Sequence, residues 1–283
     1  KLVVIDRERA LVSGRNIGDE YYTGFDEGPI TDWSQAEDIP WLDAHVEFSG
    51  SLVDNVVSLF DDGWLANGGN LPTDPPKPPM PTTATGEIRA RLISDEGEGD
   101  TACLLAYLTM IDAARHDLIL VNNFPVVASL ASAIRCALAR GVRVRFLTGC
   151  ALARRDDGTM FPGSIAREAF EYLAKRRFEA LLLDGAELYE YRVGNLPNIV
   201  SQGGRIRPYV HAKVVCVDGQ VASIGSANLD STASYWEREA NVLIEDRTTV
   251  TALQEQISTL FDQSYKIDIN SRYWESERGR REI

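Results

Sequence analysis

The chain has 283 residues, 44% hydrophobic and 25% charged, with a net charge of −13 and a pI near 4.8. This is the composition of a globular protein with enough length for two lobes. A general nucleic-acid binder normally has a basic surface, so the acidic balance argues against nucleic acid as the partner but leaves room for a local basic groove. No apolar run approaches the ~18–20 residues that a membrane span needs, and no signal peptide is visible.

The first 66 residues predict a small α/β unit. Strands are expected over 1–5, 10–13 and 41–48, with a turn at 7–9, a polar loop over 17–38 and an amphipathic helix over 50–65. Because the chain opens in the middle of strand-like sequence, we expect that further sequence precedes Lys1.

A linker is predicted over residues 67–86, which contain six prolines and the pair Gly68-Gly69. Such a composition is typical of an extended spacer. It divides the chain into a first lobe over 1–66 and a second lobe over 87–283.

The second lobe alternates helical and strand patterns. Helices are expected over 100–114, 125–141, 163–180 and 247–263, and strands over 118–121, 142–148, 186–191 and 239–244, with a hairpin over 209–226. Thr101 is a candidate N-cap, and Gly141 is placed to end its helix. Alternating helices and strands predict an α/β fold with a sheet in the middle.

The chain contains an internal repeat. Residues 211–228 read HAKVVCVDGQVASIGSAN, and residues 1–16 read KLVVIDRERALVSGRN. One constant offset aligns Lys213 with Lys1, Asp218 with Asp6, Ser226 with Gly14 and Asn228 with Asn16. A second similarity joins SLFDDGW at 58–64 to TLFDQSY at 259–265. We therefore predict two copies of one structural unit.

The polar residues of the second copy suit a phosphate. His211 and Lys213 are two apart, so they share a face of a strand, and Ser226 and Asn228 are two apart on the returning segment. A half-buried imidazole beside an ammonium is costly unless an anion lies between them. The imidazole could act as nucleophile or general acid, while the lysine and asparagine would hold the phosphoryl oxygens.

The pattern HxK-x4-D-x6-GSxN is similar to the signature of the phospholipase D superfamily. His211, Lys213, Asp218, Gly225, Ser226 and Asn228 match it without a gap. The first copy matches from Lys1 onward but reads SGRN in place of GSxN, and its histidine would lie two residues before Lys1. The stretches NIGDEYY, ILVNNFPVV and GVRVRFLTG, with Asn228-Leu229-Asp230 and Glu239-Ala240-Asn241, resemble bacterial cardiolipin synthases.

The resemblance implies two pseudo-symmetric α/β/α lobes of the phospholipase D fold, the first incomplete at its N-terminus, which meet to build one active site. It also implies a phosphohistidine mechanism that requires no metal or cofactor. One histidine attacks the phosphodiester and the other protonates the leaving alcohol. In the family the nucleophile is usually the first copy's histidine, which would make His211 the general acid and base.

The resemblance also assigns roles to site residues. Lys1, Lys213, Asn16, Asn228 and Ser226 would bind the phosphoryl oxygens. Glu239 is similar to the family's acidic partner of a catalytic histidine, and Asp43 occupies the corresponding place after the first copy. Asp6 and Asp218 complete the motif and belong to the expected catalytic set, but their distance of one strand length from the histidine favours a structural or orienting role.

The expected function is phosphatidyl transfer to an alcohol, as in cardiolipin synthesis from phosphatidylglycerol and a second phospholipid such as phosphatidylethanolamine. The partner would be a membrane surface, with the protein peripheral to a bacterial inner membrane on either face. One alternative is hydrolysis of phospholipids or of other phosphodiesters, nucleic acid included. Another is an inactive phosphate-binding module, should no histidine precede Lys1.

Several other polar and aromatic residues allow simpler interpretations. His45 and His116 are read as structural and solvated, the Lys175–Arg177 run as a solvated helix face, and the four cysteines as buried free thiols. Arg143 and Arg145 fit a charge ladder and a phosphate-facing pair equally well. The loop with Tyr21, Tyr22, Phe25 and Trp33 could cover the site, enter lipid or simply pack.

Overall fold

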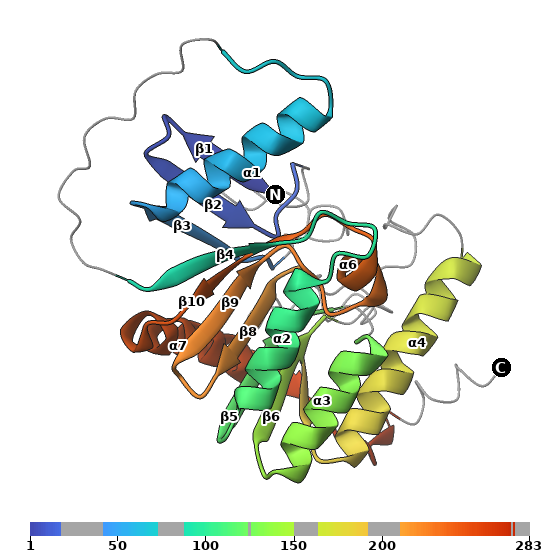
Figure 1. The fold of residues 1–283 in the computed structure, drawn as a ribbon. Coiled ribbons are helices and arrows are strands. Elements are labelled where there is room, and N and C mark those ends of the chain that lie inside the picture. The colour runs from blue at the N-terminus through green and yellow to red at the C-terminus, as the bar shows by residue number, and fades with distance from the viewer. Residues whose placement is uncertain are drawn as a thin grey trace, which may run out of the picture.

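The structure is a computed structural model that describes residues 1–17, 42–72, 88–123, 126–149, 164–191, 210–272 and 274. It contains a small and a large β-sheet, each covered by helices (Figure 1). Most of the expected 17–38 loop, with its aromatic residues, and most of the expected 67–86 linker lie outside the described residues.

The small sheet is formed by the first copy of the repeat. Strands β1 (Leu2–Ile5), β2 (Arg9–Ser13) and β3 (His45–Ser49) pair antiparallel in the order β1-β2-β3. Helix α1 (Leu52–Ala66) packs on this sheet through Val53, Val56 and Val57 (Figure 1). The predicted turn is shifted by one residue, because Arg9 already belongs to β2. The third strand starts at His45 rather than at 41, because Leu42 forms a bridge to Val210 in the second copy.

The large sheet has the strand order β11-β7-β6-β5-β8-β9-β10-β4. Its strands are β4 (Ala90–Ser94), β5 (Asp117–Val121), β6 (Arg143–Thr148), β7 (Glu187–Tyr191), β8 (Lys213–Val217), β9 (Val221–Gly225), β10 (Ala240–Ile244) and β11 (Ser264–Lys266). Strands β5, β6 and β7 are parallel, and the remaining pairings are antiparallel. The sequence did not predict β4 or β11. The α/β fold class is confirmed.

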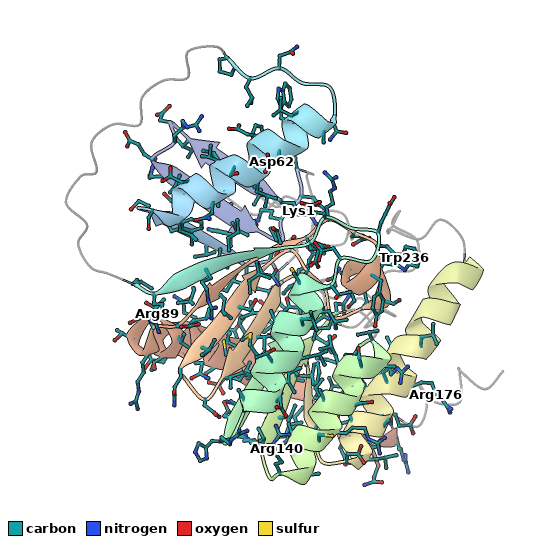
Figure 2. The ribbon with its side chains drawn as sticks, in the orientation of Figure 1. Lys1, Asp62, Arg89, Arg140, Arg176 and Trp236 are labelled. Atoms are coloured by element: carbon teal, nitrogen blue, oxygen red, sulfur yellow. The ribbon has the colours of Figure 1, made fainter. Side chains whose placement is uncertain are left out.

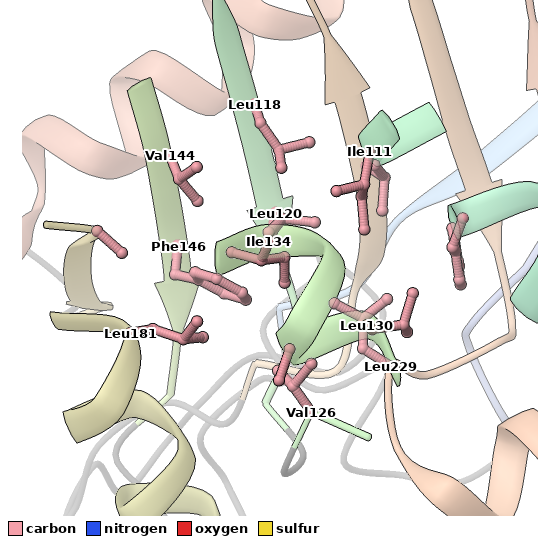
Figure 3. Packing of buried hydrophobic residues seen from close by; sticks show 14 of the residues in the cluster. Ile111, Leu118, Leu120, Val126, Leu130, Ile134, Val144, Phe146, Leu181 and Leu229 are labelled. Atoms are coloured by element: carbon pink, nitrogen blue, oxygen red, sulfur yellow. The ribbon is translucent and has the colours of Figure 1, made fainter. Parts of the chain in front are cut away.

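Helices cover both faces of the large sheet. Helices α2 (Ala102–Ala113), α3 (Ala128–Ala139) and α4 (Ser164–Leu183) lie on one face, and α7 (Arg247–Asp262) lies on the other (Figure 1). Figure 3 shows Ile134 of α3 and Leu181 of α4 packed against Phe146 of β6, within a core cluster whose members are nearly all inaccessible to solvent. The short helix α6 (Ser231–Tyr235) was not predicted.

Two helix ends test the expected caps. Thr101 is the N-cap residue of α2, as expected, but its side chain makes no capping hydrogen bond. Instead, the backbone N–H of Cys103 donates to Asp95 Oδ1 at 2.8 Å from the end of β4. Gly141 does end α3, with a φ of +84° that suits glycine.

The structure repeats itself as the sequence does. In the first copy Leu2 pairs with Val12, and in the second copy Val214 pairs with Ile224, so the two hairpins share one register. Each hairpin is followed by a third antiparallel strand and a helix: β3 and α1, or β10 and α7. The repeated unit is therefore a β-β-β-α element.

The structure tests the expectations for the cysteines, for Lys175 and for a membrane span. Cys103 and Cys216 are buried free thiols, whereas Cys136 is exposed, so burial was wrong for that residue. Lys175 is also buried, over the ring of Trp274, rather than solvated. Among the described residues, no helix combines the length and apolar character of a membrane span.

Candidate active site

Strand direction gathers the polar residues of the large sheet at one edge. The parallel strands β5, β6 and β7 end at this edge, β9 and β4 end there too, and β8 and β10 begin there. Buried polar side chains follow or precede these strand ends: Asp95, Asn122, Asn123, Thr148, His211, Lys213, Ser226, Glu239 and Asn241. Ligands of α/β sheets bind outside the carboxyl ends of strands, which makes this edge the candidate site.

The two copies meet at this edge through their backbones. The N–H groups of His211 and Ala212 both donate to the carbonyl oxygen of Leu42, at 2.7 and 3.0 Å. In Figure 2, Lys1 of the first copy lies near this edge, whereas Arg140, at the end of α3, lies at the opposite end of the molecule. The start of β8 is therefore held by the segment that precedes β3.

His211 is oriented by a carboxylate of the other copy. Its Nδ1 lies 2.8 Å from Asp43 Oδ2, and both side chains are buried. An ionised carboxylate only accepts hydrogen bonds, so Nδ1 carries the proton and Nε2 carries the ring's lone pair. Burial lowers the pKa of His211 to about 4, although the hydrogen bond to Asp43 opposes the shift. The imidazole is neutral near pH 7 and suited to attack or to accept a proton.

Lys213 is almost completely buried beside this histidine. Only 2% of the residue is exposed, and its Nζ donates to the carbonyl oxygen of His211. Burial lowers the pKa of Lys213 to about 7, while the Asp43 carboxylate acts in the opposite direction. A bound anion would favour the charged ammonium, as expected for a lysine that holds phosphoryl oxygens.

Glu239 occupies the equivalent place in the second copy. Ser226 Oγ donates to its Oε2, and the backbone N–H of Ala240 donates to Ser226 Oγ at 3.1 Å. Burial raises the pKa of Glu239 to about 7, and the positive charge at Lys1 is among the effects that oppose this. Glu239 thus lies near Lys1, the first copy's counterpart of Lys213.

Gly14 explains why the first copy reads SGRN rather than GSxN. A Cβ atom at Gly14 would lie 2.5 Å from Asp43 Oδ1 and 3.2 Å from Lys213 Cδ. Real Cβ atoms essentially never make a contact of 2.5 Å. The serine of the second copy therefore has no room at this position while Asp43 reaches His211.

The remaining expected phosphate ligands lie at the ends of the same strands. Lys1 and Asn16 are exposed, and Asn228 is partly buried between the fully buried Ala227 and Leu229. Lys1 directly precedes β1, and Asn16 and Asn228 come three residues after β2 and β9. Both copies therefore place their lysine and asparagine where the two hairpins open towards the site.

Asp218 and Asp6 are displaced from the chemistry. Both follow the far ends of their strands, in left-handed turns with a φ of +53°. The Asp218 carboxylate accepts the backbone N–H groups of Arg115, His116 and Asp117, each at 2.8 Å. Partial burial opposes the effect, but these hydrogen bonds lower the pKa of Asp218. Because β8 separates Asp218 from His211, the placement favours the structural or orienting role that was expected for the two aspartates over a direct part in catalysis.

Arg143 and Arg145 form the charge ladder rather than a phosphate-facing pair. Arg143 donates to both carboxylate oxygens of Glu187, at 2.6 and 3.2 Å. Arg145 donates to Asp117 Oδ2 at 2.7 Å. His116 is exposed, as expected, and His45, which was expected to be structural, is exposed as well.

Two buried asparagines at the site were missed from the sequence. Asn122 Oδ1 accepts the N–H of Leu229, and Asn123 Oδ1 accepts the N–H of Gly149, at 3.3 and 3.1 Å. The sequence did contain an indication of these residues, because two adjacent asparagines directly after an apolar strand are unusual in a protein core.

Comparison with known proteins assigns the family. The family model described as "Cardiolipin synthase, PLD-like domain" matches residues 107–262, more than half of the chain. The chain belongs to this family. The match confirms the resemblance to the phospholipase D superfamily and to cardiolipin synthases that the motif indicated.

Two curated relatives match almost the whole chain. Cardiolipin synthase A of Pseudomonas entomophila is 27% identical over 268 residues, which are 94% of this chain and 48% of the relative. The probable cardiolipin synthase YwiE of Bacillus subtilis is 23% identical over 273 residues, 94% of this chain and 46% of the relative. The chain thus spans about half the length of the curated relatives it matches.

A solved structure supports the fold. The crystal structure of phosphatidylserine synthase from Haemophilus influenzae superposes with a TM-score of 0.65 at 14% identity, over 92% of this chain and 61% of that one. At this identity the likeness concerns the fold.

Proposed function

We propose that this protein is a phosphatidyltransferase of the cardiolipin synthase type that acts through a phosphohistidine intermediate. The observation that carries the proposal is the pair of His211 and Asp43, contributed by different copies and buried at the edge where both hairpins open. The family match and the names of the relatives support the same reaction class. The substrate would be a phospholipid phosphodiester, with phosphatidylglycerol and phosphatidylethanolamine as candidates.

Two histidines would share the reaction. One attacks phosphorus, forming a P–N bond as the P–O bond to the leaving alcohol breaks, and the other gives its proton to that alcohol. An acceptor alcohol then returns a proton to the second histidine while its oxygen attacks phosphorus and the P–N bond breaks. The motif places the first copy's histidine two residues before Lys1, and Glu239, near Lys1, is the carboxylate that would orient it.

The charges around the site support this sequence of steps. Neutral His211 can attack or accept a proton at once, and a bound phosphate would raise its pKa and allow it to act as an acid. Lys1, Lys213, Asn16 and Asn228 would hold the phosphoryl oxygens as charge develops, with preorganised donors worth about 10²–10³-fold each in rate. Ser226 would act through Glu239.

Transfer and hydrolysis would use the same residues and differ in whether an alcohol or water reaches the intermediate. An active-site edge that is open to a membrane would favour an alcohol acceptor, and we propose peripheral association with a bacterial inner membrane. Hydrolysis of phospholipids or other phosphodiesters, nucleic acid included, is the alternative, as is phosphate binding without turnover.

The test is an assay of the intact protein on vesicles of phosphatidylglycerol, alone and with phosphatidylethanolamine, with products resolved by mass spectrometry. We expect cardiolipin from wild type and from His45→Ala, whose exposed histidine lies on β3, and none from His211→Ala. Phosphatidic acid without cardiolipin would make the protein a lipase. Cleavage of bis(p-nitrophenyl) phosphate without any lipid product would remove the lipid assignment, and binding without turnover would leave a phosphate-binding module.

A further inference from the structure

Asn123 lies at the same edge as the candidate site but has no role in the chemistry described so far. It follows the end of β5, the strand that pairs with β8, and only 3% of the residue is exposed. Its neighbour Gly149 would place a Cβ atom 2.9 Å from the backbone nitrogen of Val210, the residue before His211. Asn123, Gly149 and the start of the motif are therefore packed against one another.

The orientation of the Asn123 amide is fixed by its oxygen. The backbone N–H of Gly149 donates to Oδ1 at 3.1 Å, and Thr148 Oγ1 lies 3.3 Å from the same atom. Because a backbone N–H can only donate, the atom that faces it must be the oxygen. The NH2 group consequently points away from Gly149.

This NH2 group is buried without a hydrogen-bond partner among the residues that the structure describes. A buried donor without a partner is destabilising relative to a satisfied one, so it calls for a physical explanation. The buried Asn241 makes the contrast clear, because its Oδ1 accepts the N–H of Ala227 at 3.2 Å while its Nδ2 donates to Tyr107 at 2.9 Å. Asn241 is a closed structural link, whereas Asn123 has a fixed oxygen and an unused donor.

We infer that Asn123 is a substrate-binding residue whose NH2 group donates to an oxygen of the phosphodiester. The inference rests on the proposed function and extends it to a residue outside the repeated motif. A donor held in place before binding needs no reorganisation when the substrate arrives, which offsets its cost in the free protein. The acceptor is either a phosphoryl oxygen or a hydroxyl of the alcohol headgroup, and a substrate comparison separates the two.

The experiment compares Asn123→Ala and Asn123→Asp in the intact protein. Alanine removes both the donor and the acceptor, whereas aspartate keeps an acceptor for the Gly149 N–H, removes the donor and adds a negative charge. The surface variant Asn67→Asp, at the exposed end of α1, makes the same chemical change far from any buried contact and serves as the control. KM and kcat are measured with phosphatidylglycerol vesicles and with bis(p-nitrophenyl) phosphate, which has phosphoryl oxygens but no hydroxyl.

We expect KM to rise by about tenfold to a hundredfold in both Asn123 variants, the effect of one lost hydrogen bond to a polar or charged group, with kcat changed less. A rise with both substrates identifies a phosphoryl oxygen, and a rise with phosphatidylglycerol alone identifies the headgroup. If Asn123 merely positioned Gly149, aspartate would restore the wild-type KM, and that result overturns the inference. Unchanged KM in both variants also overturns it.

Failure of the proposed function gives a different result. A wild-type protein that cleaves bis(p-nitrophenyl) phosphate but no lipid loses the lipid assignment while the Asn123 comparison proceeds on that substrate. A wild-type protein without turnover is tested by its rise in Tm with inorganic phosphate, which should be smaller in both Asn123 variants. Equal rises in wild type and variants, or no rise in wild type, overturn the inference.

Discussion

The two copies of the repeat share a strand register but differ in burial. All five residues of β8 and of β10 are buried, because α2 and α3 cover one face of the large sheet, and α7 together with the small sheet and α1 covers the other. In the first copy β1 and β3 alternate between exposed and half-buried residues, with Val3 and Ile5 exposed. The shared register fixes where the polar residues lie, whereas their burial differs between the copies.

The paired positions illustrate this division. Lys213 and Lys1 begin equivalent strands, yet Lys213 is buried and Lys1 is exposed. Asp43 and Glu239 precede equivalent strands, but Asp43 contacts the histidine of the other copy while Glu239 accepts from Ser226. Duplication therefore supplies a symmetric frame, and local packing makes its two halves chemically distinct.

The largest effect is expected from removing the carboxylate that crosses between the copies. In Asp43→Asn the amide can donate to Nδ1 of His211, which moves the ring proton to Nε2 and removes the lone pair from the site. We expect kcat to fall about 10²–10⁴-fold, the usual value of general acid–base catalysis. Glu239→Gln is the matched variant in the other copy, and kinetics of both under one assay compare the two halves. Wild-type kcat in Asp43→Asn would refute the orienting role.

Introducing the second copy's serine into the first should have the next largest effect. In Gly14→Ser the new Cβ displaces Asp43 from His211, so we expect kcat to fall about 10–100-fold, since a misplacement of about 1 Å can cost a factor of that size. Gly63→Ser on α1 is the control, because a Cβ at Gly63 meets no atom within 4 Å. A Gly14→Ser variant as active as this control would show that contact with Asp43 is not the reason for glycine at position 14.

A smaller effect should appear in the pH profile. Because the pKa of Lys213 is lowered to about 7, the ammonium is lost as pH rises through 7, and Glu239 becomes negative over the same range. Both changes weaken anion binding, so kcat/KM should fall above pH 7, by up to about tenfold per pH unit. On the acid side, kcat/KM should fall as His211 becomes protonated near pH 4 if His211 is the nucleophile, and should not fall if it is the general acid, which needs this proton.

Lys213→Arg tests whether the fall of kcat/KM above pH 7 comes from deprotonation of Lys213. Arginine stays charged throughout the range, so the fall above pH 7 should become shallower in this variant. An unchanged alkaline limb would assign it to another group.

The smallest effect on activity is expected at the motif aspartates, where stability should change instead. Asp218→Asn removes a carboxylate that accepts three N–H groups while keeping a residue type that tolerates positive φ. We expect the free energy of unfolding to fall by about 1–2 kcal/mol, at the lower end because the site is partly exposed. Asp6→Asn, at the exposed counterpart, should stay within about 0.5 kcal/mol. Denaturant unfolding measures both.

The sign of the pH dependence follows from the lowered pKa of Asp218. A carboxyl group whose pKa is lower in the folded state stabilises the protein above its unfolded pKa of about 3.9, and this stabilisation is lost as pH falls through the folded value. The difference between wild type and Asp218→Asn should therefore shrink below about pH 4. A difference that stays constant down to pH 2 would mean that the charge of Asp218 does not account for it.

Local features were predictable from the sequence. The HxK spacing placed His211 and Lys213 together at the start of a strand, although β8 begins only at Lys213, two residues after His211. The constant offset between copies anticipated that β1–β2 and β8–β9 share a register. These predictions held because they depend on residues close in the chain and on one repeated pattern. β4 escaped prediction because its five residues, ARLIS, show no clear alternation and gain their strand identity from pairing with β10.

The contact that builds the site could not be read from local pattern. Asp43 and His211 are 168 positions apart, and their approach depends on the bridge between Leu42 and Val210 and on the missing side chain at Gly14. The resemblance placed Asp43 in the correct region but not its partner. The hydrogen bond at the start of α2 could not be read from local pattern either, because Asp95, which follows β4, accepts the N–H of Cys103 in place of a Thr101 side-chain cap.

The contacts of Leu42 and Asp43 with the second copy have a consequence for biosynthesis. When only the first copy has been synthesised, the Asp43 carboxylate has no imidazole to orient, and the second copy alone lacks the carboxylate that contacts Nδ1 of His211. Chemical competence therefore arises only when the two halves dock, late in synthesis. The same contact makes turnover a reporter of correct docking, because a chain that folds both sheets but misaligns them by one residue has every motif residue in place and no reactive centre.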